Sequence, residues 1–272
     1  MAGSQLIPSG AATSVRLMKP ALVLGLVLAC AAVAMSQTTP ANGGAAPGLP
    51  LSQFENQYRS AADRLHHVLL AVIAWGNHGH VSVGTGFFID EHGTFLTAAH
   101  VLDPQPGVVR FGAYYPFGNA KGFSRIQVIS LDRERDIAVC RMVLDNAEAS
   151  ALPPFEYLPL AKGAAPAPGT FVAVAGFPLG SLRPIFQFGT VASLEEPGGL
   201  LQVGLMLNDG DSGGPVIEVG SGALVGMVVS VRTTDLYEGQ HSGQGQQNSG
   251  LSWVLPGHAL LTSLQTASND SR

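Results

Sequence analysis

Short apolar segments separated by turn-forming residues dominate the chain after about residue 66. Some are continuous apolar runs and others alternate apolar with polar residues, and both patterns are typical of β-strands when glycine, proline or asparagine bounds them. The expected strands lie at residues 67–75, 80–90, 93–102, 124–132, 136–144, 170–178, 186–194, 200–207, 214–219, 223–231 and 251–256. Short strands at near-regular intervals predict an all-β protein built from barrels.

Two features organise this series of strands into domains. Ser52 stands three residues before Glu55, as in a capping box, and predicts a short helix that ends at about Leu65. At about residues 149–169 the chain becomes rich in alanine, proline and glycine, which is typical of a domain boundary. The expected units are an N-terminal helix with a first barrel at 51–150, a linker at 151–169, a second barrel with a C-terminal helix at 170–265, and a tail at 266–272.

The beginning of the chain has the pattern of an export signal. Arg16 and Lys19 precede an uncharged run at residues 21–35, and small residues lie near the end of that run. The run is too short to span a bilayer comfortably. We therefore predict a signal peptide at residues 1–36, with Met18 as an alternative start, and a mature protein that is exported from the cytoplasm.

A second interpretation of the same segment stays open. Residues 26–30, Leu-Val-Leu-Ala-Cys, are similar to a bacterial lipoprotein box, which would make Cys30 a lipidated N-terminus that holds the protein on a membrane. An uncleaved apolar anchor is a third interpretation. Residues 37–50 are small, polar and proline-rich, and they predict a flexible linker between this segment and the folded part.

Composition and charge narrow the classes of partner. The 272-residue chain has a formal net charge of −5, and its 14 lysine and arginine residues are scattered, so nucleic acid is excluded as a partner. Two cysteines, Cys30 and Cys140, are too few to define a disulfide framework. Cys140 lies in an apolar run and is expected to be a small core residue.

Three polar residues stand where a nucleophilic site can be built. His100 follows one expected strand, Asp136 precedes another, and Ser212 lies in the Gly-Asp-Ser-Gly-Gly-Pro segment at residues 210–215. A serine hydroxyl becomes a useful nucleophile when a base removes its proton and a third group orients that base. Neighbouring glycines let two backbone N–H groups converge on an oxyanion, and Gly210 and Ser212 are the expected donors.

These motifs resemble the chymotrypsin superfamily, and in particular the bacterial HtrA/Deg-type protease domain, over about residues 66–265. The chain order His, Asp, Ser matches that superfamily. The segments that carry the resemblance lie at residues 84–102, 136–142, 172–180, 188–194, 210–215 and 249–264. The resemblance implies two six-stranded antiparallel β-barrels with short N- and C-terminal helices. It also implies a serine endopeptidase with the triad His100, Asp136 and Ser212, which acts on protein or peptide substrates through an acyl-enzyme.

Two features depart from the family pattern. In chymotrypsin the acid before the nucleophile pairs with a freed N-terminal amine, and no comparable activation site is evident here. Asp211 must therefore have another partner or lie near solvent. Typical HtrA proteins continue into PDZ domains, whereas this chain ends about where the protease domain should end, so we expect no PDZ domain.

Two other functions remain as alternatives. Residues 210–214 also satisfy the Gly-x-Ser-x-Gly elbow of a serine esterase, and Asp235 and His258 follow in the order of that fold. That elbow needs a helix directly after the serine, whereas Pro215 and a β-rich segment follow here. A catalytically silent binding module with a protease fold is the other alternative, although such modules usually lack a triad member.

The remaining polar segments give weaker signals. His78, His80 and His92 surround a glycine-rich turn without a carboxylate or cysteine pattern, so no metal site is expected. Acyl transfer by serine and histidine needs no cofactor. The polar loop at residues 233–250 is interpreted as a surface insertion, with a flap over the substrate cleft as the alternative.

The resemblance also implies the position of the specificity pocket. In chymotrypsin-like enzymes the residue six places before the nucleophile forms the pocket floor, and here that residue is Met206. The strand that includes Val229, Ser230 and Val231 is expected to form one wall. Val231 falls where a glycine would keep a deep pocket open, and a shift of one residue would put Ser230 or Arg232 there. A thioether floor and a branched wall favour a small aliphatic side chain such as alanine or valine.

Overall fold

The computed structural model describes residues 51–76, 81–102, 108–117, 121–144, 154–160, 166–196, 199–229 and 250–270. The predicted signal peptide, the alternative anchor at Cys30 and the linker at residues 37–50 lie outside these ranges, as do Ser230, Val231 and nearly all of the loop at 233–250. Residues 49–272 form one compact unit. Within the described ranges, no helix has the length and apolar character needed to cross a membrane.

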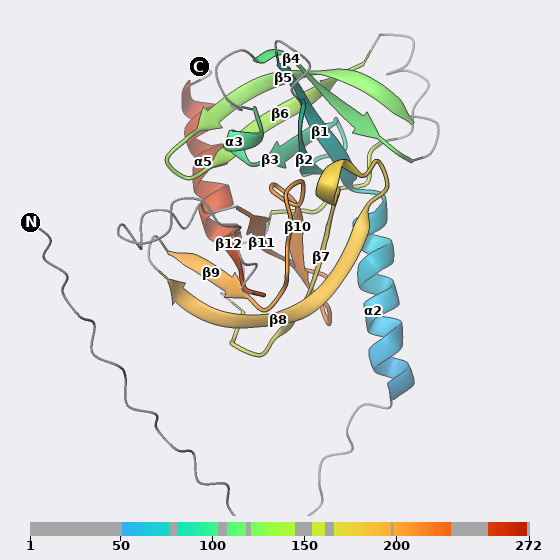
Figure 1. Cartoon of the computed structure of the whole chain (residues 1–272). Coiled ribbons are helices and arrows are strands. Elements are labelled where there is room, and N and C mark those ends of the chain that lie inside the picture. The colour runs from blue at the N-terminus through green and yellow to red at the C-terminus, as the bar shows by residue number, and fades with distance from the viewer. Residues whose placement is uncertain are drawn as a thin grey trace, which may run out of the picture. The chain divides into compact units, whose positions relative to one another are not determined.

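The first half of the folded unit is a closed antiparallel barrel of six strands (Figure 1). Its strands are β1 (Leu69–Gly76), β2 (Val81–Phe88), β3 (Thr94–Thr97), β4 (Val108–Tyr115), β5 (Gly122–Asp132) and β6 (Ile137–Val143). They follow the order β1-β2-β3-β6-β5-β4, and β4 pairs with β1 to close the barrel. Because this barrel is closed, its strands have no unpaired edge that could form hydrogen bonds with a strand of another chain.

The second half repeats this topology. Its strands are β7 (Phe171–Gly176), β8 (Ile185–Glu196), β9 (Leu200–Val203), β10 (Pro215–Glu218), β11 (Leu224–Val228) and β12 (Ser252–Pro256). Starting from β7, the order is β7-β8-β9-β12-β11-β10, and β10 closes onto β7, which is the same connectivity as in the first barrel. The prediction of an all-β fold with two six-stranded antiparallel barrels is confirmed.

Helices cover the outside of the barrels. The α2 helix (Leu51–His66) buries Ala61 and Leu65 and packs against β7 and β10. The α5 helix (Gly257–Asp270) packs against β11 and β12 of the second barrel and against β5 and β6 of the first (Figure 1). It continues past residue 265, so most of the expected tail is helical. A short helix, α3 (Ala99–Leu102), contacts β1, β2 and β6, and a 3₁₀ turn, η2 (Pro178–Gly180), contacts β2.

Alternating residues of β7 build two parts of the core. Val172 and Val174 belong to the cluster inside the second barrel, whereas Ala173 and Ala175 belong to the larger cluster that also fills the first barrel. Successive side chains of a strand point to opposite faces, so β7 contributes one face to its own barrel and the other to the contact with the first. The two barrels therefore share buried apolar surface.

Two sequence predictions concern residues in this shared core. Cys140 is fully buried, as predicted, and burial raises the pKa of its thiol to about 12, so it remains a protonated core residue. Part of the predicted linker is also packed, because Phe155 and Leu158 are buried against the first barrel. The Phe155 ring lies 4.4 Å from the Phe88 ring, measured between centroids.

Candidate active site

His100 and Asp136 meet at one end of the first barrel. His100 is the second residue of α3, and Asp136 ends the turn between β5 and β6. Nδ1 of His100 lies 2.7 Å from Oδ2 of Asp136, and the His100 backbone N–H donates to Oδ1 at 2.8 Å. The backbone carbonyl of Asp136 accepts a hydrogen bond from Ala99 at 3.2 Å. Asp136 thus holds both the ring and the backbone of His100.

This contact decides which ring nitrogen of a neutral His100 carries the proton. An ionised carboxylate can only accept hydrogen bonds, so Nδ1 must be the donor, and Nε2 keeps its lone pair. The two side chains are 44% and 26% exposed, which leaves the pair open to an approaching substrate. A histidine held in this way is oriented to take a proton at Nε2.

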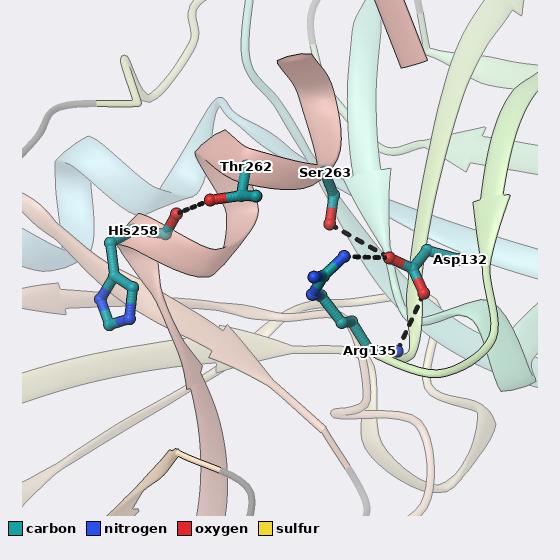
Figure 2. A network of polar contacts seen from close by, with 5 residues as sticks. All are labelled: Asp132, Arg135, His258, Thr262 and Ser263. Carbon is teal, nitrogen blue, oxygen red and sulfur yellow. Dashed lines mark hydrogen bonds and ion pairs between the residues drawn. The ribbon is translucent and has the colours of Figure 1, made fainter. Parts of the chain in front are cut away.

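The turn that carries Asp136 is fixed by its own side-chain contacts. The backbone N–H and the guanidinium of Arg135 each donate to the Asp132 carboxylate at 3.0 Å, and Ser263 of α5 donates to the same carboxylate at 3.4 Å. Figure 2 shows these contacts, together with the Thr262 hydroxyl that donates to the His258 carbonyl within α5. Asp136 itself has a φ of 58°, a conformation that a non-glycine residue keeps only when its surroundings enforce it.

Ser212 lies in the loop between β9 and β10 and is 6% exposed. The preceding residues form a turn in which the Asp211 N–H donates to the Asn208 carbonyl at 3.0 Å. Gly210 is the third residue of this turn and has a φ of 101°, as a type II turn requires. A side chain at Gly210 would put its Cβ 2.3 Å from the Phe177 carbonyl oxygen. Both the positive φ and this short distance therefore require glycine at this position.

The loop that carries Ser212 packs against the first barrel. The Ser212 carbonyl accepts a hydrogen bond from the Thr85 N–H of β2 at 2.8 Å. A Cβ on Gly213 would lie 2.2 Å from the Thr85 carbonyl oxygen and 2.8 Å from the Ala98 nitrogen, two residues before His100. The loop therefore lies beside the segment that leads to His100. Within the described part of the chain, Ser212 Oγ and His100 are not hydrogen-bonded, and such contacts commonly tighten only when substrate binds.

Asp211 has partners other than an N-terminal amine. It is only 1% exposed, and its Oδ2 accepts hydrogen bonds from the Asn208 N–H at 2.9 Å and from Gln187 Nε2 at 3.4 Å. Its Oδ1 has no hydrogen-bond partner among the described residues. Burial raises the pKa of this carboxyl from 3.8 to about 6, because the charged form loses its hydration.

The expected pocket residues differ in their surroundings. Met206 is 54% exposed. The Ser252 hydroxyl holds the backbone on both sides of Met206, since it donates to the Leu205 carbonyl at 2.8 Å and accepts from the Leu207 N–H at 3.3 Å. Val229 is 3% exposed and belongs to the core, while Ser230 and Val231 lie outside the described residues.

Sequence reasoning missed several residues that support the site. Thr85, Gln187 and Ser252 each bond the loop that carries Ser212, from strands far away in the chain. Leu179 of η2, whose φ is 55°, donates its N–H to the Asp209 carbonyl at 2.7 Å. Thr85 had one visible signal, because it stands between two glycines in an apolar strand; Leu179 had none.

The alternative chemistries have less support in the described ranges. The strand β10 follows the serine where an esterase elbow needs a helix, and Asp235 lies outside the described residues. Among the residues that are described, His, Cys, Asp and Glu do not gather in a group that could hold a metal ion. His92 is exposed and lies 3.8 Å from Glu91, while His78 and His80 lie outside the described ranges.

Comparison with known sequences identifies a family model and relatives that match this chain. A family model described as "Trypsin-like peptidase domain" matches residues 84–227. The human protein "Serine protease HTRA4" is 29% identical over 205 residues, which cover 68% of this chain and 39% of that protein. "Uncharacterized protein y4bJ" of Sinorhizobium fredii is 27% identical over 162 residues, covering 55% of this chain and 22% of that protein. The chain spans less than half the length of these two relatives.

Solved structures share the fold. The serine endoprotease from Yersinia pestis superposes with a TM-score of 0.60 at 19% identity, covering 79% of this chain and 68% of that chain. A structure of the HtrA-type protease AlgW with a tripeptide gives a TM-score of 0.60 at 18% identity, covering 77% and 62%. The resemblance to HtrA-type proteases is thus confirmed in sequence and in fold. Because the family model also matches more than half of the sequence, this chain belongs to the trypsin-like peptidase family.

Proposed function

We propose that this protein is a serine endopeptidase in which Ser212 is the nucleophile, His100 is the general base and acid, and Asp136 orients His100. The observation that carries the proposal is the 2.7 Å contact between His100 Nδ1 and Asp136 Oδ2, which leaves Nε2 ready to accept a proton. The Ser212 loop lies beside the segment that ends in His100. Family membership supports the same reaction class.

The proposed reaction follows from these positions. Nε2 of His100 takes the Ser212 proton while Oγ attacks the substrate carbonyl carbon, and the carbonyl oxygen becomes an oxyanion. The N–H groups of Gly210 and Ser212 stabilise that oxyanion; removing one such donor typically slows turnover by about 10²- to 10³-fold. His100 then protonates the leaving amine, and water hydrolyses the acyl-enzyme by the same base catalysis. No step requires a cofactor.

An active-site serine reagent tests this proposal. A fluorophosphonate should phosphonylate the wild-type protein on Ser212, as located by mass spectrometry of the labelled peptide, and should not label Ser212→Ala. A folded wild-type protein that is not labelled would favour the silent binding module. His258→Ala separates peptidase from esterase, because it should keep full labelling in the peptidase and lose it in the esterase.

We propose a preference for small aliphatic residues on the acyl side of the cleaved bond. Met206 supports it, because its exposed thioether side chain carries no charge and the Ser252 hydroxyl fixes the backbone on both sides of it. Two substrates that differ by one methylene in such a pocket differ by only about 1–3 kcal/mol in transition-state binding, so the preference should be modest. A peptide-library profile tests it: Met206→Asp should shift cleavage towards lysine and arginine, whereas a wild-type preference for those residues would contradict it.

We also propose that the mature protein works outside the cytoplasm on protein or peptide substrates. The charged start and the apolar run at residues 21–35 support export. Mass spectrometry of the natural protein distinguishes the interpretations: cleavage near residue 36 indicates a signal peptide, and a lipid on Cys30 indicates a lipoprotein. An unmodified Met1 or Met18 terminus in the cytosol would contradict export.

A further inference from the structure

We infer that Thr85 is a positioning residue for the oxyanion site: it binds the backbone carbonyls of both residues whose N–H groups receive the oxyanion. This inference rests on the proposed function. Thr85 belongs to β2 of the first barrel and is fully buried. Its backbone N–H donates to the Ser212 carbonyl at 2.8 Å, and its hydroxyl donates to the Gly210 carbonyl at 2.7 Å.

Because each peptide unit is planar, the direction of an oxyanion N–H is tied to the carbonyl of the preceding residue, and the carbonyls that Thr85 binds belong to the peptide units that follow. Gly210 lies between two such units. The carbonyl of the preceding unit, that of Asp209, accepts from Leu179 at 2.7 Å, and the carbonyl of the following unit, that of Gly210 itself, accepts from Thr85. With the units on both sides held, the Gly210 N–H cannot turn away without breaking one of these bonds.

The same arrangement recurs at Ser212. The carbonyl of the preceding peptide unit, that of Asp211, accepts a hydrogen bond from the Gly214 N–H at 2.9 Å. The carbonyl of the following unit, that of Ser212, accepts from the Thr85 N–H at 2.8 Å. Thr85 is therefore the residue that holds the C-terminal side of both oxyanion donors, through its hydroxyl at one and its backbone at the other.

The Thr85 hydroxyl has little freedom to bond elsewhere. Its oxygen accepts from the Phe177 N–H at 3.0 Å, so its hydrogen is directed to Gly210. The Thr85 carbonyl accepts from the Thr97 hydroxyl at 2.7 Å, and Thr97 stands three residues before His100. One buried threonine thus links the oxyanion turn of the second barrel to the strand that leads to the base in the first.

Glycines make the close approach to Thr85 feasible. A Cβ on Gly176 would lie 2.8 Å from the Thr85 hydroxyl oxygen, and one on Gly213 would lie 2.2 Å from the Thr85 carbonyl oxygen. Both distances are too short for a real side chain. Removal of the hydroxyl would leave the Gly210 carbonyl and the Phe177 N–H buried without these partners, whereas serine would preserve both bonds.

The test compares Thr85→Val, which keeps the shape without the hydroxyl, with Thr85→Ser, which keeps the hydroxyl. The first readout is the rate constant for fluorophosphonate labelling of Ser212, since phosphonylation also develops charge on an oxygen in that site. Labelling of Thr85→Val should be about 10- to 100-fold slower than that of the wild type, which is a smaller loss than removal of a whole oxyanion donor would cause. The same variant should have a lower kcat on peptides with little change in KM. Thr85→Ser should stay within about threefold of wild type.

Thr94→Val is the matched control, because Thr94 is a buried threonine of the same barrel whose hydroxyl bonds Arg141. It should lose stability without loss of labelling rate. Equal rates for folded Thr85→Val and wild type would overturn the inference, as would equal losses in Thr85→Val and Thr94→Val. If Thr85→Val does not fold, Thr85→Ala takes its place under the same criteria. Absence of labelling in the wild type would instead contradict the proposed function, and this inference with it.

Discussion

Asp136 binds His100 at two points, and this double contact is central at the scale of single residues. One carboxylate oxygen orients the ring and the other holds the backbone N–H, at 2.7 and 2.8 Å. The residue accepts a left-handed backbone conformation to do so. Strain of this kind, on the order of 1–3 kcal/mol, persists where surrounding contacts enforce it, and it commonly occurs at functional sites.

Asp136→Asn tests the orienting role. An asparagine amide would donate to Nδ1 and so place the ring proton on Nε2, where it blocks base catalysis. We expect kcat to fall by about 10⁴-fold, with little change in stability or KM. Steady-state kinetics on a peptide substrate provide the measurement, with Asp63→Asn on the exposed face of α2 as the control. Near-normal kcat in Asp136→Asn would show that His100 is not oriented by this carboxylate.

Asp211 gives a pH-dependent prediction. Its pKa is raised from 3.8 to about 6, so the folded protein retains a proton that the unfolded chain has already lost. Stability from this group is therefore present at low pH and is lost as pH rises from about 4 through 6. Asp211→Asn should raise the denaturant midpoint at pH 7.5 and leave it almost unchanged at pH 4. An equal shift at both pH values would contradict burial of the charge as the cause.

At the scale of elements, the turn between β5 and β6 is joined to α5. The Asp132 carboxylate receives two hydrogen bonds from Arg135 and one from Ser263 (Figure 2). Four residues later, the turn places Asp136 against His100. A helix that follows the second barrel thus supports a site residue of the first. The packing of α5 against strands of both barrels is consistent with this role.

Asp132→Ala tests that support. The loss of these bonds should lower the free energy of unfolding by about 1–3 kcal/mol, and kcat should fall because the turn no longer fixes Asp136. Ser263→Ala removes only the 3.4 Å bond and should cost less than about 1 kcal/mol with kcat unchanged. Denaturant unfolding and peptide kinetics measure both variants. A normal kcat in folded Asp132→Ala would show that the turn keeps its shape without this network.

Most strands were predictable from the sequence, whereas the supports of the site were not. Alternating and continuous apolar runs indicated every described strand except β4 (Val108–Tyr115), and the spacing of β-rich segments indicated two barrels. Phe155 and Leu158 were assigned to a linker because proline and alanine dominate around them, but their apolar side chains pack on the first barrel. Thr85 and Leu179 act through bonds to residues far along the chain, and such pairs leave no local pattern.

At the scale of the whole molecule, the two barrels form a single structural unit. They share an apolar cluster, and Thr85 bonds both Gly210 and Ser212 across the boundary. The candidate site lies at this boundary, with His100 and Asp136 from the first barrel and Ser212 from the second. Separation of the barrels would therefore take the proposed nucleophile, Ser212, away from the proposed base, His100.

The two tryptophans report on this coupling. Trp75 lies in β1 of the first barrel and Trp253 in β12 of the second. Trp253→Phe leaves a fluorophore in the first barrel only, and Trp75→Phe leaves one in the second. We expect fluorescence and circular dichroism to give one denaturant midpoint within each variant, because the shared core makes unfolding cooperative. A barrel that melts separately would appear as a fluorescence midpoint well apart from that of circular dichroism.

The most direct test of the central claim is the rate at which the protein cleaves unfolded, fluorescently labelled casein with and without the Ser212 hydroxyl. The wild-type protein should release fluorescent peptides, and Ser212→Ala should lose at least about 10³-fold in kcat while its unfolding midpoint and circular dichroism spectrum stay the same. Equal cleavage by the two proteins would contradict the account, because the activity would then come from something other than the site built around His100, Asp136 and Ser212.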